Sequence, residues 1–158
     1  ERIGAGAFSN CTNLETVNVR DLDAWYNIVF ENESANPLSN GVYLYHNGTL
    51  VSTIDVPEEV TSVQDSLFAG CFADTVVLHA GVVSVGNNAF NSQTLNIVRC
   101  EGDVPAALGE QCFGNGVSQI YVPYASIEVY RGAETWAAYV DKLVAYDFAA
   151  DKPYIPEE

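Results

Sequence analysis

The chain has no methionine, only two histidines, and six lysines and arginines against 21 aspartates and glutamates. The resulting charge of −15 repels phosphate backbones and anionic lipid, so we expect no nucleic-acid partner. No apolar run approaches the roughly 20 residues of a membrane-spanning helix, so we expect no direct membrane insertion. The 158 residues are 48% hydrophobic, which argues against disorder and predicts one domain with its own core.

A repeat with a period near 22 residues runs through the chain. Phenylalanine recurs at Phe8, Phe68, Phe90 and Phe113. A short strand pattern with three apolar positions ends about ten residues after each of these phenylalanines. One further pattern of the same kind follows an insertion. The five patterns are Leu14/Val17/Val19, Val51/Ile54/Val56, Ala73/Val76/Leu78, Leu95/Val98/Cys100 and Val117/Ile120/Val122. A unit of this length cannot bury its apolar side alone, so the spacing predicts stacked units.

The predicted fold is a right-handed solenoid of about 22-residue units with one face of parallel strands. Apolar pairs such as Val60/Val63 and Val82/Val85 form the return side. One unit is decorated by an insertion at about residues 20–50, in which Asn47-Gly48 predicts a β-hairpin. The repeat domain covers residues 1–148.

The C-terminal part departs from the repeat and predicts a cap at about residues 123–148. Ser126 is a candidate N-cap for a short helix, and Tyr130, Trp136 and Tyr139 can cover the end of the core. Leu143 to Phe148 can add a last strand, and residues 149–158 are interpreted as a tail or linker. The chain begins inside a repeat, so we interpret it as a fragment that further repeats precede.

The segment from Ile3 to Val19 and the segment from Val60 to Cys71 resemble BspA-like leucine-rich repeats of bacterial cell-surface proteins. The segment from Leu22 to Gly48 resembles the decorated repeat of that family, and Val122 to Trp136 resembles its C-terminal cap. The resemblance implies an extracellular or cell-surface protein without enzymatic activity, an adhesin or host-interaction module. Its partner would be a protein of the matrix, of a host or of a neighbouring cell.

Sites for metals, cofactors or catalysis are not predicted. No cysteine or histidine lies within four residues of another, as zinc sites require. Cys11 and Cys71 share a repeat position about 9 to 10 Å apart, beyond disulfide reach, so the four cysteines are predicted to be mostly buried thiols. His46 and His79 are predicted on surface loops. The carboxylates are dispersed, and a filled core offers no cleft for an enzyme.

Strand alternation directs a second set of side chains away from the core, and these are the candidate binding residues. The two predicted columns are Thr16, Thr53, Thr75, Ile97, Gln119 and Asn18, Asp55, Val77, Arg99, Tyr121. We expect a protein partner to bind this nearly neutral face, with Arg99 and Tyr121 as anchors. The alternative is that threonine and valine occur here because they favour strands.

Two other functions remain open. Trp25, Tyr26, Tyr43 and Tyr45 cluster around the hairpin and can stack on a glycan, or they can form a local minicore that supports the hairpin. The fragment can also be a structural stalk or spacer, with the ligand site in further repeats.

Overall fold

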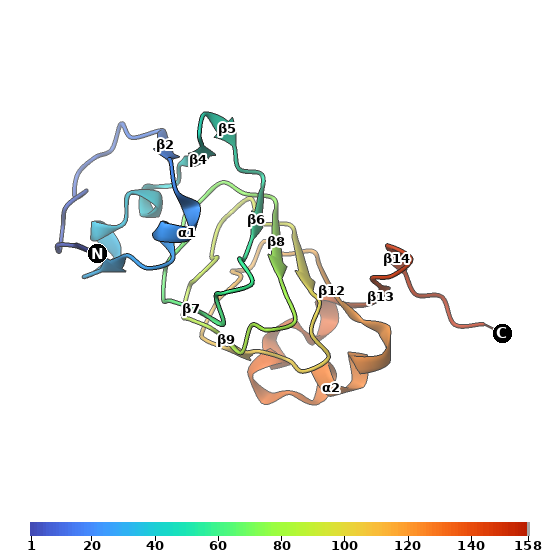
Figure 1. Cartoon of the computed structure of the whole chain (residues 1–158). Helices are drawn as coiled ribbons and strands as arrows, with labels where there is room; N and C mark the ends of the chain where they lie inside the picture. Colours follow the sequence, from blue (N-terminus) through green and yellow to red (C-terminus); the bar gives the residue numbers. More distant parts are fainter. Residues whose placement is uncertain (158) are drawn as a thin grey trace.

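The protein is described from a computed structural model over residues 1–157. Its largest sheet has six strands in the order β14-β13-β12-β10-β8-β6. These strands are β6 (Thr53–Asp55), β8 (Thr75–Leu78), β10 (Ile97–Cys100), β12 (Gln119–Pro123), β13 (Leu143–Asp147) and β14 (Lys152–Pro153). All neighbours are parallel except β13 and β14. In Figure 1 the sheet runs from the middle of the molecule toward the C-terminus.

The parallel strands follow the sequence repeat in register. Thr53 faces Thr75, Thr75 faces Ile97, and Ile97 faces Gln119, so each partner lies 22 residues further along the chain. The next residue of each strand, from Ile54 to Ile120, is buried. Because side chains alternate between the two faces, the repeated apolar positions point into the core and their neighbours point outward.

A second, smaller sheet forms the return side. It joins β7 (Ser62–Val63), β9 (Ser84–Val85) and β11 (Ala107–Leu108) in parallel. Val63, Val85 and Leu108 are buried, and the Ser84 hydroxyl donates to the Ser62 hydroxyl at 2.9 Å. The core therefore lies between two sets of short parallel strands.

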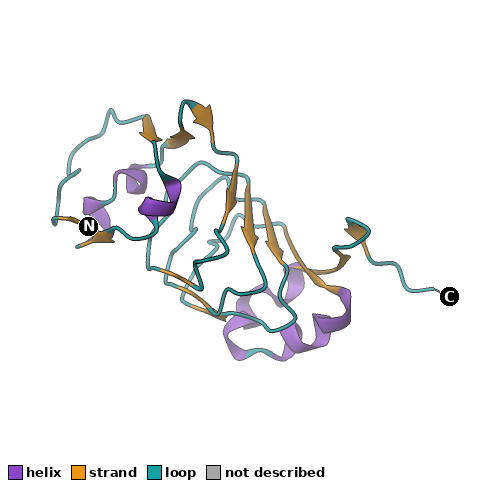
Figure 2. Cartoon of the chain, viewed as in Figure 1, coloured by secondary structure: helices purple, strands orange, loops and turns teal. Residues whose placement is uncertain are grey.

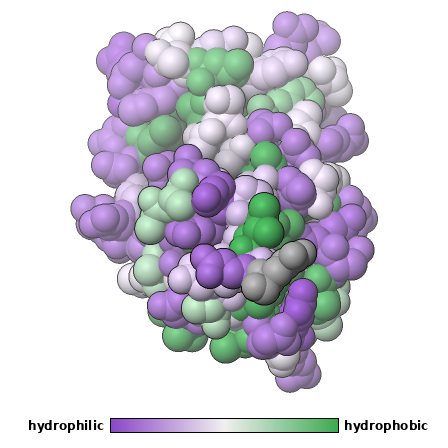
Figure 3. Space-filling model, turned by 90° about the vertical axis from the view of Figure 1, so that its right-hand side faces the viewer, coloured by the Kyte–Doolittle hydropathy of each residue, from purple (hydrophilic) through white to green (hydrophobic). Residues whose placement is uncertain are grey.

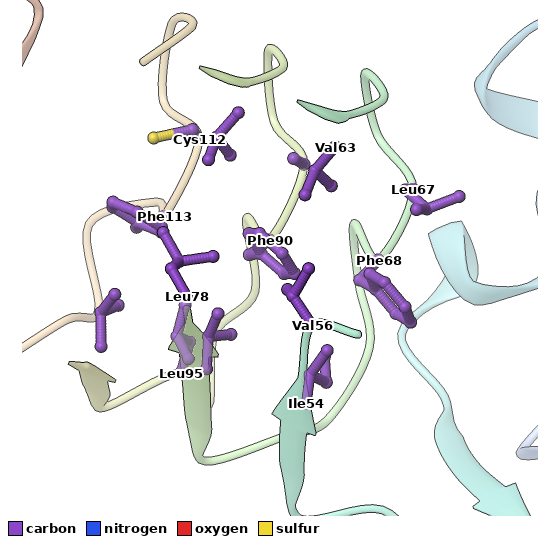
Figure 4. Packing of buried hydrophobic residues seen from close by; sticks show 14 of the residues in the cluster. Ile54, Val56, Val63, Leu67, Phe68, Leu78, Phe90, Leu95, Cys112 and Phe113 are labelled. Carbon is purple, nitrogen blue, oxygen red and sulfur yellow. The ribbon is translucent and has the colours of Figure 1, made fainter. Parts of the chain in front are cut away.

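Phenylalanine rings connect one unit to the next inside this core. Phe68 stacks on Phe90 with 5.6 Å between ring centroids, and Phe90 stacks on Phe113 at 6.3 Å. Figure 4 shows the three rings in a row among the aliphatic side chains of both sheets. The recurring phenylalanine of the sequence is thus a direct packing contact between neighbouring units.

The N-terminal part contains two separate small sheets. Their strands are β1 (Arg2–Ile3) with β3 (Val29–Phe30), and β2 (Thr16–Val19) with β4 (Tyr43–His46) and β5 (Thr49–Leu50). Between the strands lie α1 (Leu22–Trp25) and two 3₁₀ helices, η1 (Glu33–Ala35) and η2 (Pro37–Asn40). An isolated parallel bridge between Val42 and Cys71 links this part to the following unit.

The alignment of β2 with β6 that the sequence spacing predicts is wrong. Thr16 pairs with Tyr43 and Asn18 with Tyr45, because the first strand of the hairpin lies beside β2. β4 and β5 then pair antiparallel across Asn47-Gly48. The hairpin strand β4 continues the parallel pairing of β2, and β6 begins the larger sheet.

Helical segments close the C-terminal end, as Figure 2 shows in purple. They are η3 (Tyr124–Ser126), α2 (Ile127–Gly132) and η4 (Glu134–Lys142). The Tyr130 hydroxyl donates to the carbonyl of Gly102 at 2.7 Å, and the Trp136 indole donates to that of Ala106 at 2.8 Å. These bonds attach the cap to the loop of the last complete unit.

One detail of the predicted cap is wrong. The Ser126 side chain does not cap α2; its hydroxyl donates to the Asp103 carboxylate at 2.8 Å. Within residues 149–158, which the sequence suggests are a tail or linker, Lys152 and Pro153 form β14 against β13. Among residues 1–157, no helix is long and apolar enough to cross a membrane.

Candidate interaction face

The outward side chains of β6, β8, β10 and β12 form two rows across the larger sheet. The rows are Thr53, Thr75, Ile97, Gln119 and Asp55, Val77, Arg99, Tyr121. Neighbours in a row are about 4.8 Å apart, the spacing of paired strands. Thr53, Asp55 and Gln119 are exposed, and the other five are half-buried. We call these eight residues the strand face.

The C-terminal segment, residues 146–154, binds Arg99 from within the same chain. The Arg99 guanidinium lies 3.0 Å from the Asp151 carboxylate and about 5 Å from the ring centroids of Tyr146 and Phe148. The Tyr146 hydroxyl donates to the same carboxylate at 3.0 Å. The charge of Arg99, a predicted anchor, therefore already has a partner within the chain.

Tyr121 is held in the same way. Its ring stacks on Tyr146 with 4.5 Å between centroids, and its hydroxyl donates to Gln119 at 2.8 Å. Tyr124 stacks on Tyr154 at 4.2 Å. The segment thus occupies the β10 and β12 half of the strand face and leaves the β6 and β8 half open.

Asp151 responds electrostatically to this arrangement. The hydrogen bond from Arg99, followed by that from Tyr146, lowers the pKa of the Asp151 carboxyl. The carboxylate is well exposed, so the ion pair contributes little to stability. The pair is one of several contacts between the segment and the strands, together with the stacking of Tyr146 on Tyr121.

Asn18, another predicted face residue, has a different task. Its side-chain oxygen accepts a hydrogen bond from the Gly48 amide at 3.1 Å and so holds the turn of the hairpin. Its place beside Tyr45 separates it from Asp55. Asn18 does not belong to the strand face of β6 to β12.

The four hairpin aromatics differ in burial. Trp25 is 5% and Tyr26 7% exposed. The Trp25 indole donates to the Leu67 carbonyl at 3.3 Å, and the Tyr26 ring packs edge-on against Phe68. Tyr45 is half-buried, whereas Tyr43 is 48% exposed and touches Phe72 edge-on. Of the four, Tyr43 presents the largest exposed ring surface.

A small hollow opens where the sheet is interrupted between the hairpin and β6. It has a volume of about 150 Å³ and is lined by Leu22, Asp23, Tyr26, Leu44, His46, Val51, Thr53, Ile54, Asp55, Pro57 and Phe68. We call it the sheet-end hollow. No sequence pattern indicates this hollow, because it depends on the displacement of β6 from β2.

A much wider and shallower hollow, about 790 Å³, lies beside the turns of the repeats. Its lining is mostly small, polar and amide-bearing, and comprises Glu33, Ser39, Asn40, Gly41, Ala69, Gly70, Phe72, Asn88, Asn91, Ser92, Gln93, Asn115 and Gly116. We call it the amide hollow. Recurring asparagines near each phenylalanine were the available sequence signal.

Comparison with known families matches the chain to the BspA type leucine rich repeat region, in six copies, over residues 1–96 and 39–133. The chain belongs to this family. The resemblance expected from the repeats is confirmed. No protein with a curated description matches the chain.

Buried thiols stabilise the BspA-type repeats by packing. Cys71, Cys100 and Cys112 are buried, Cys11 is half-buried, and none forms a disulfide within residues 1–157. Burial raises the pKa of the Cys71 and Cys112 thiols to about 12, and that of Cys100 further. A thiol that stays protonated is a poor nucleophile, so these side chains serve the core.

The histidines differ from the prediction of two surface-loop residues. His79 is half-buried, accepts from the Gly81 amide at 3.0 Å and lies 3.0 Å from the Val60 carbonyl. Because its Nδ1 accepts, its Nε2 carries the proton and donates to Val60, which ties one BspA-type unit to the preceding one. Within residues 1–157, no group of three His, Cys, Asp or Glu side chains could hold a metal ion.

Proposed function

We propose that the chain is part of a non-enzymatic extracellular surface protein that binds a protein partner through the strand face. The partner is a matrix protein or a surface protein of a host or neighbouring cell, in an adhesin or host-interaction role. Proteins of the BspA-type family are typically surface-associated, which supports this location. The proposal includes the right-handed solenoid of about 22-residue units, whose strands supply an extended surface.

The in-register rows of outward side chains carry the proposal. Such a surface can contact a partner over several strands without further loops. Because the C-terminal segment occupies Arg99 and Tyr121, the proposed contact centres on Thr53, Asp55 and Thr75. Val77 and Ile97 border this area, and Gln119 lies one strand further along the same row. The contact area is thus displaced toward β6 relative to the sequence-based prediction.

The test is a binding screen against arrayed matrix proteins at low and moderate salt, since an acidic surface attracts basic proteins nonspecifically in low salt. A salt-resistant partner is then measured against Thr53→Lys with Thr75→Lys. The matched control, Thr61→Lys with Val83→Lys, adds the same charge at exposed positions on the return side. We expect a loss of about tenfold or more for the first pair only, since lysine disrupts a packed contact. Equal effects would contradict binding through the strand face.

Glycan binding is the second candidate, because the exposed Tyr43 packs against Phe72, which lines the amide hollow. Amide groups bond sugar hydroxyls, and an aromatic face stacks on sugar rings. A glycan array that loses its signal with Tyr43→Ala and keeps it with Tyr124→Ala would favour this candidate. Absence of any ligand in both screens would favour the spacer function.

A further inference from the structure

The sheet-end hollow contains an unused hydrogen-bonding group. Tyr26 is only 7% exposed, so more than nine-tenths of it is buried. Its hydroxyl nevertheless makes no hydrogen bond within residues 1–157. Every fully enclosed side-chain nitrogen or oxygen in the described part of the chain has a partner. The free hydroxyl is therefore still open to solvent, and the hollow that Tyr26 lines provides that access.

Two unpaired carboxylates accompany this hydroxyl at the hollow. Asp23 comes from the first turn of α1, and Asp55 ends β6. Neither takes part in the ion pairs of residues 1–157. Both act on Tyr26: burial first, then Asp55 and Asp23, raise the pKa of its hydroxyl. The hydroxyl and the two carboxylates line the same small hollow, so one ligand placed there can meet all three.

Most of the remaining lining is apolar, with Thr53 and His46 as its polar members. Leu44, Ile54 and Phe68 are almost fully buried and provide the floor, and Val51 and Pro57 contribute to the walls. His46 also lines the hollow, and its Nε2 is occupied by the Asn47 amide at 3.0 Å. A matching ligand therefore has an apolar stem and a cationic, hydrogen-donating end.

Charge elsewhere in the chain favours an external cation. Of the six lysines and arginines, Arg2, Arg99, Arg131 and Lys142 are already paired with acids of the same chain. The net charge of −15 leaves a large excess of carboxylates. Basic segments of a partner are therefore drawn to this surface before they make contact.

We propose that the sheet-end hollow binds one lysine side chain of the protein partner. This inference rests on the proposed function and names the chemistry of the contact on the β6 side of the strand face. The apolar floor holds the lysine stem, and the ammonium donates to Asp23, Asp55 and the Tyr26 hydroxyl. The volume equals that of about five water molecules and matches the non-hydrogen atoms of one lysine side chain.

Lysine fits these acceptors better than arginine does. The acceptors are three separate groups, from α1, from its C-cap Tyr26 and from β6, and an ammonium has three rotatable donors. A planar guanidinium instead prefers one carboxylate in a two-point contact.

The experiment is a titration of the whole chain with blocked tetralysine at moderate salt, followed by NMR of the backbone amides. We expect shifts at residues of the hollow and no shifts with the Nε-acetylated peptide, which has lost its charge. Asp23→Asn with Asp55→Asn should weaken binding about tenfold or more, and Tyr26→Phe about threefold, from lost charge-assisted hydrogen bonds. The control Glu110→Gln with Glu134→Gln removes two exposed acids elsewhere and should change binding less than about twofold.

Three results would overturn the proposal: equal weakening by both double variants, shifts spread over the whole acidic surface, or equally tight binding of tetraarginine. The outcome is separable from that of the proposed function. Tetralysine binding in the hollow with no partner in the protein screen would contradict the function and support the lysine site. A partner that binds the strand face equally well after Asp23→Asn with Asp55→Asn would contradict the lysine site and support the proposed function.

Discussion

A left-handed backbone conformation recurs at the residue two positions before each phenylalanine of the repeat. Gly6, Ser66, Asn88 and Gln111 all have positive φ, between 50° and 71°. Only one of them is glycine, although this region strains other residues by about 1–2 kcal/mol. The turn before each ring therefore depends on contacts between units that hold the left-handed residue in place.

Gly70, two residues after Phe68, also has a positive φ and gives a direct test of what such a backbone conformation contributes. Its φ is +80°, and an added Cβ would overlap the carbonyl oxygen of Leu38 in the N-terminal part. Gly48 has the same φ in the hairpin turn, with open space around it. We expect Gly70→Ala to lower the free energy of unfolding by at least ~2 kcal/mol more than Gly48→Ala, in urea denaturation. Equal losses would mean that backbone strain alone matters at Gly70.

Arg99 shows where residue-level prediction from sequence stops. Alternation correctly directs its side chain out of the core, beside Val77 and Tyr121. Its partner Asp151 lies 52 residues away in a segment without repeat pattern, so no local spacing indicates the ion pair. The same holds for the sheet-end hollow, which joins α1, the hairpin and β6.

At the scale of elements, the cap replaces the next repeat in its contacts with the core. Trp136 and Tyr139 lie 6.1 and 5.4 Å from the Phe113 ring and continue the row of phenylalanines. In Figure 3, which faces the C-terminal side, hydrophobic residues form only small separate groups. The cap thus ends the core without a broad apolar surface.

The Tyr139 hydroxyl is the cap's polar link to the last ring. It accepts a hydrogen bond from the buried Phe113 amide at 3.2 Å. Tyr139→Phe leaves that amide without a partner and should cost about 1–3 kcal/mol in urea denaturation. Tyr124→Phe removes an exposed hydroxyl and should stay within about 0.5 kcal/mol. A Tyr139→Phe protein as stable as the parent would show that water replaces the lost bond.

Elements with strong local signals were predictable, and those defined by distant pairing were not. The four strands β6, β8, β10 and β12 follow from apolar spacing, and Asn47-Gly48 marks the turn between β4 and β5. β14 has a proline and two residues, so its pairing depends on β13 and not on its own sequence. Ser126 was a plausible cap by type, yet the nearby Asp103 takes its hydrogen bond.

At the scale of the whole molecule, the two ends of the chain meet the sheet differently. The N-terminal part is joined by one backbone bridge and by side chains such as Asn36, which donates to the carbonyls of Ser66 and Leu67 at 3.0 Å. The C-terminal segment instead folds back onto the outward side of β10 and β12. One end extends the core, and the other covers part of the proposed binding surface.

Acid should weaken the contact between this covering segment and Arg99. The lowered pKa of Asp151 means that its bond to Arg99 favours the folded arrangement above the ordinary value of 3.8 and loses that contribution as pH falls through the lowered value. We expect NMR signals of the Arg99 guanidinium to move toward those of a free arginine in acid. Asp151→Asn should produce the same change at neutral pH, together with faster exchange of the Tyr154 amide, which donates to Ala145.

Asp141→Asn is the matched control, since Asp141 is similarly exposed and its nitrogen-to-oxygen distance to Lys142 is 4.0 Å. It should leave the Arg99 and Tyr154 signals unchanged. Unaltered Arg99 signals in Asp151→Asn would show that the rings of Tyr146 and Phe148 hold the guanidinium without the ion pair.

The stack of short parallel strands also has a mechanical consequence, because the two termini lie at opposite ends of it (Figure 1). A pulling force between the termini acts across the strands and separates one unit from the next. Each 22-residue step between paired strands holds about 70 Å of extended chain and occupies only about 5 Å along the stack. Tension between the termini would therefore lengthen the molecule in regular increments, and each released unit would absorb work.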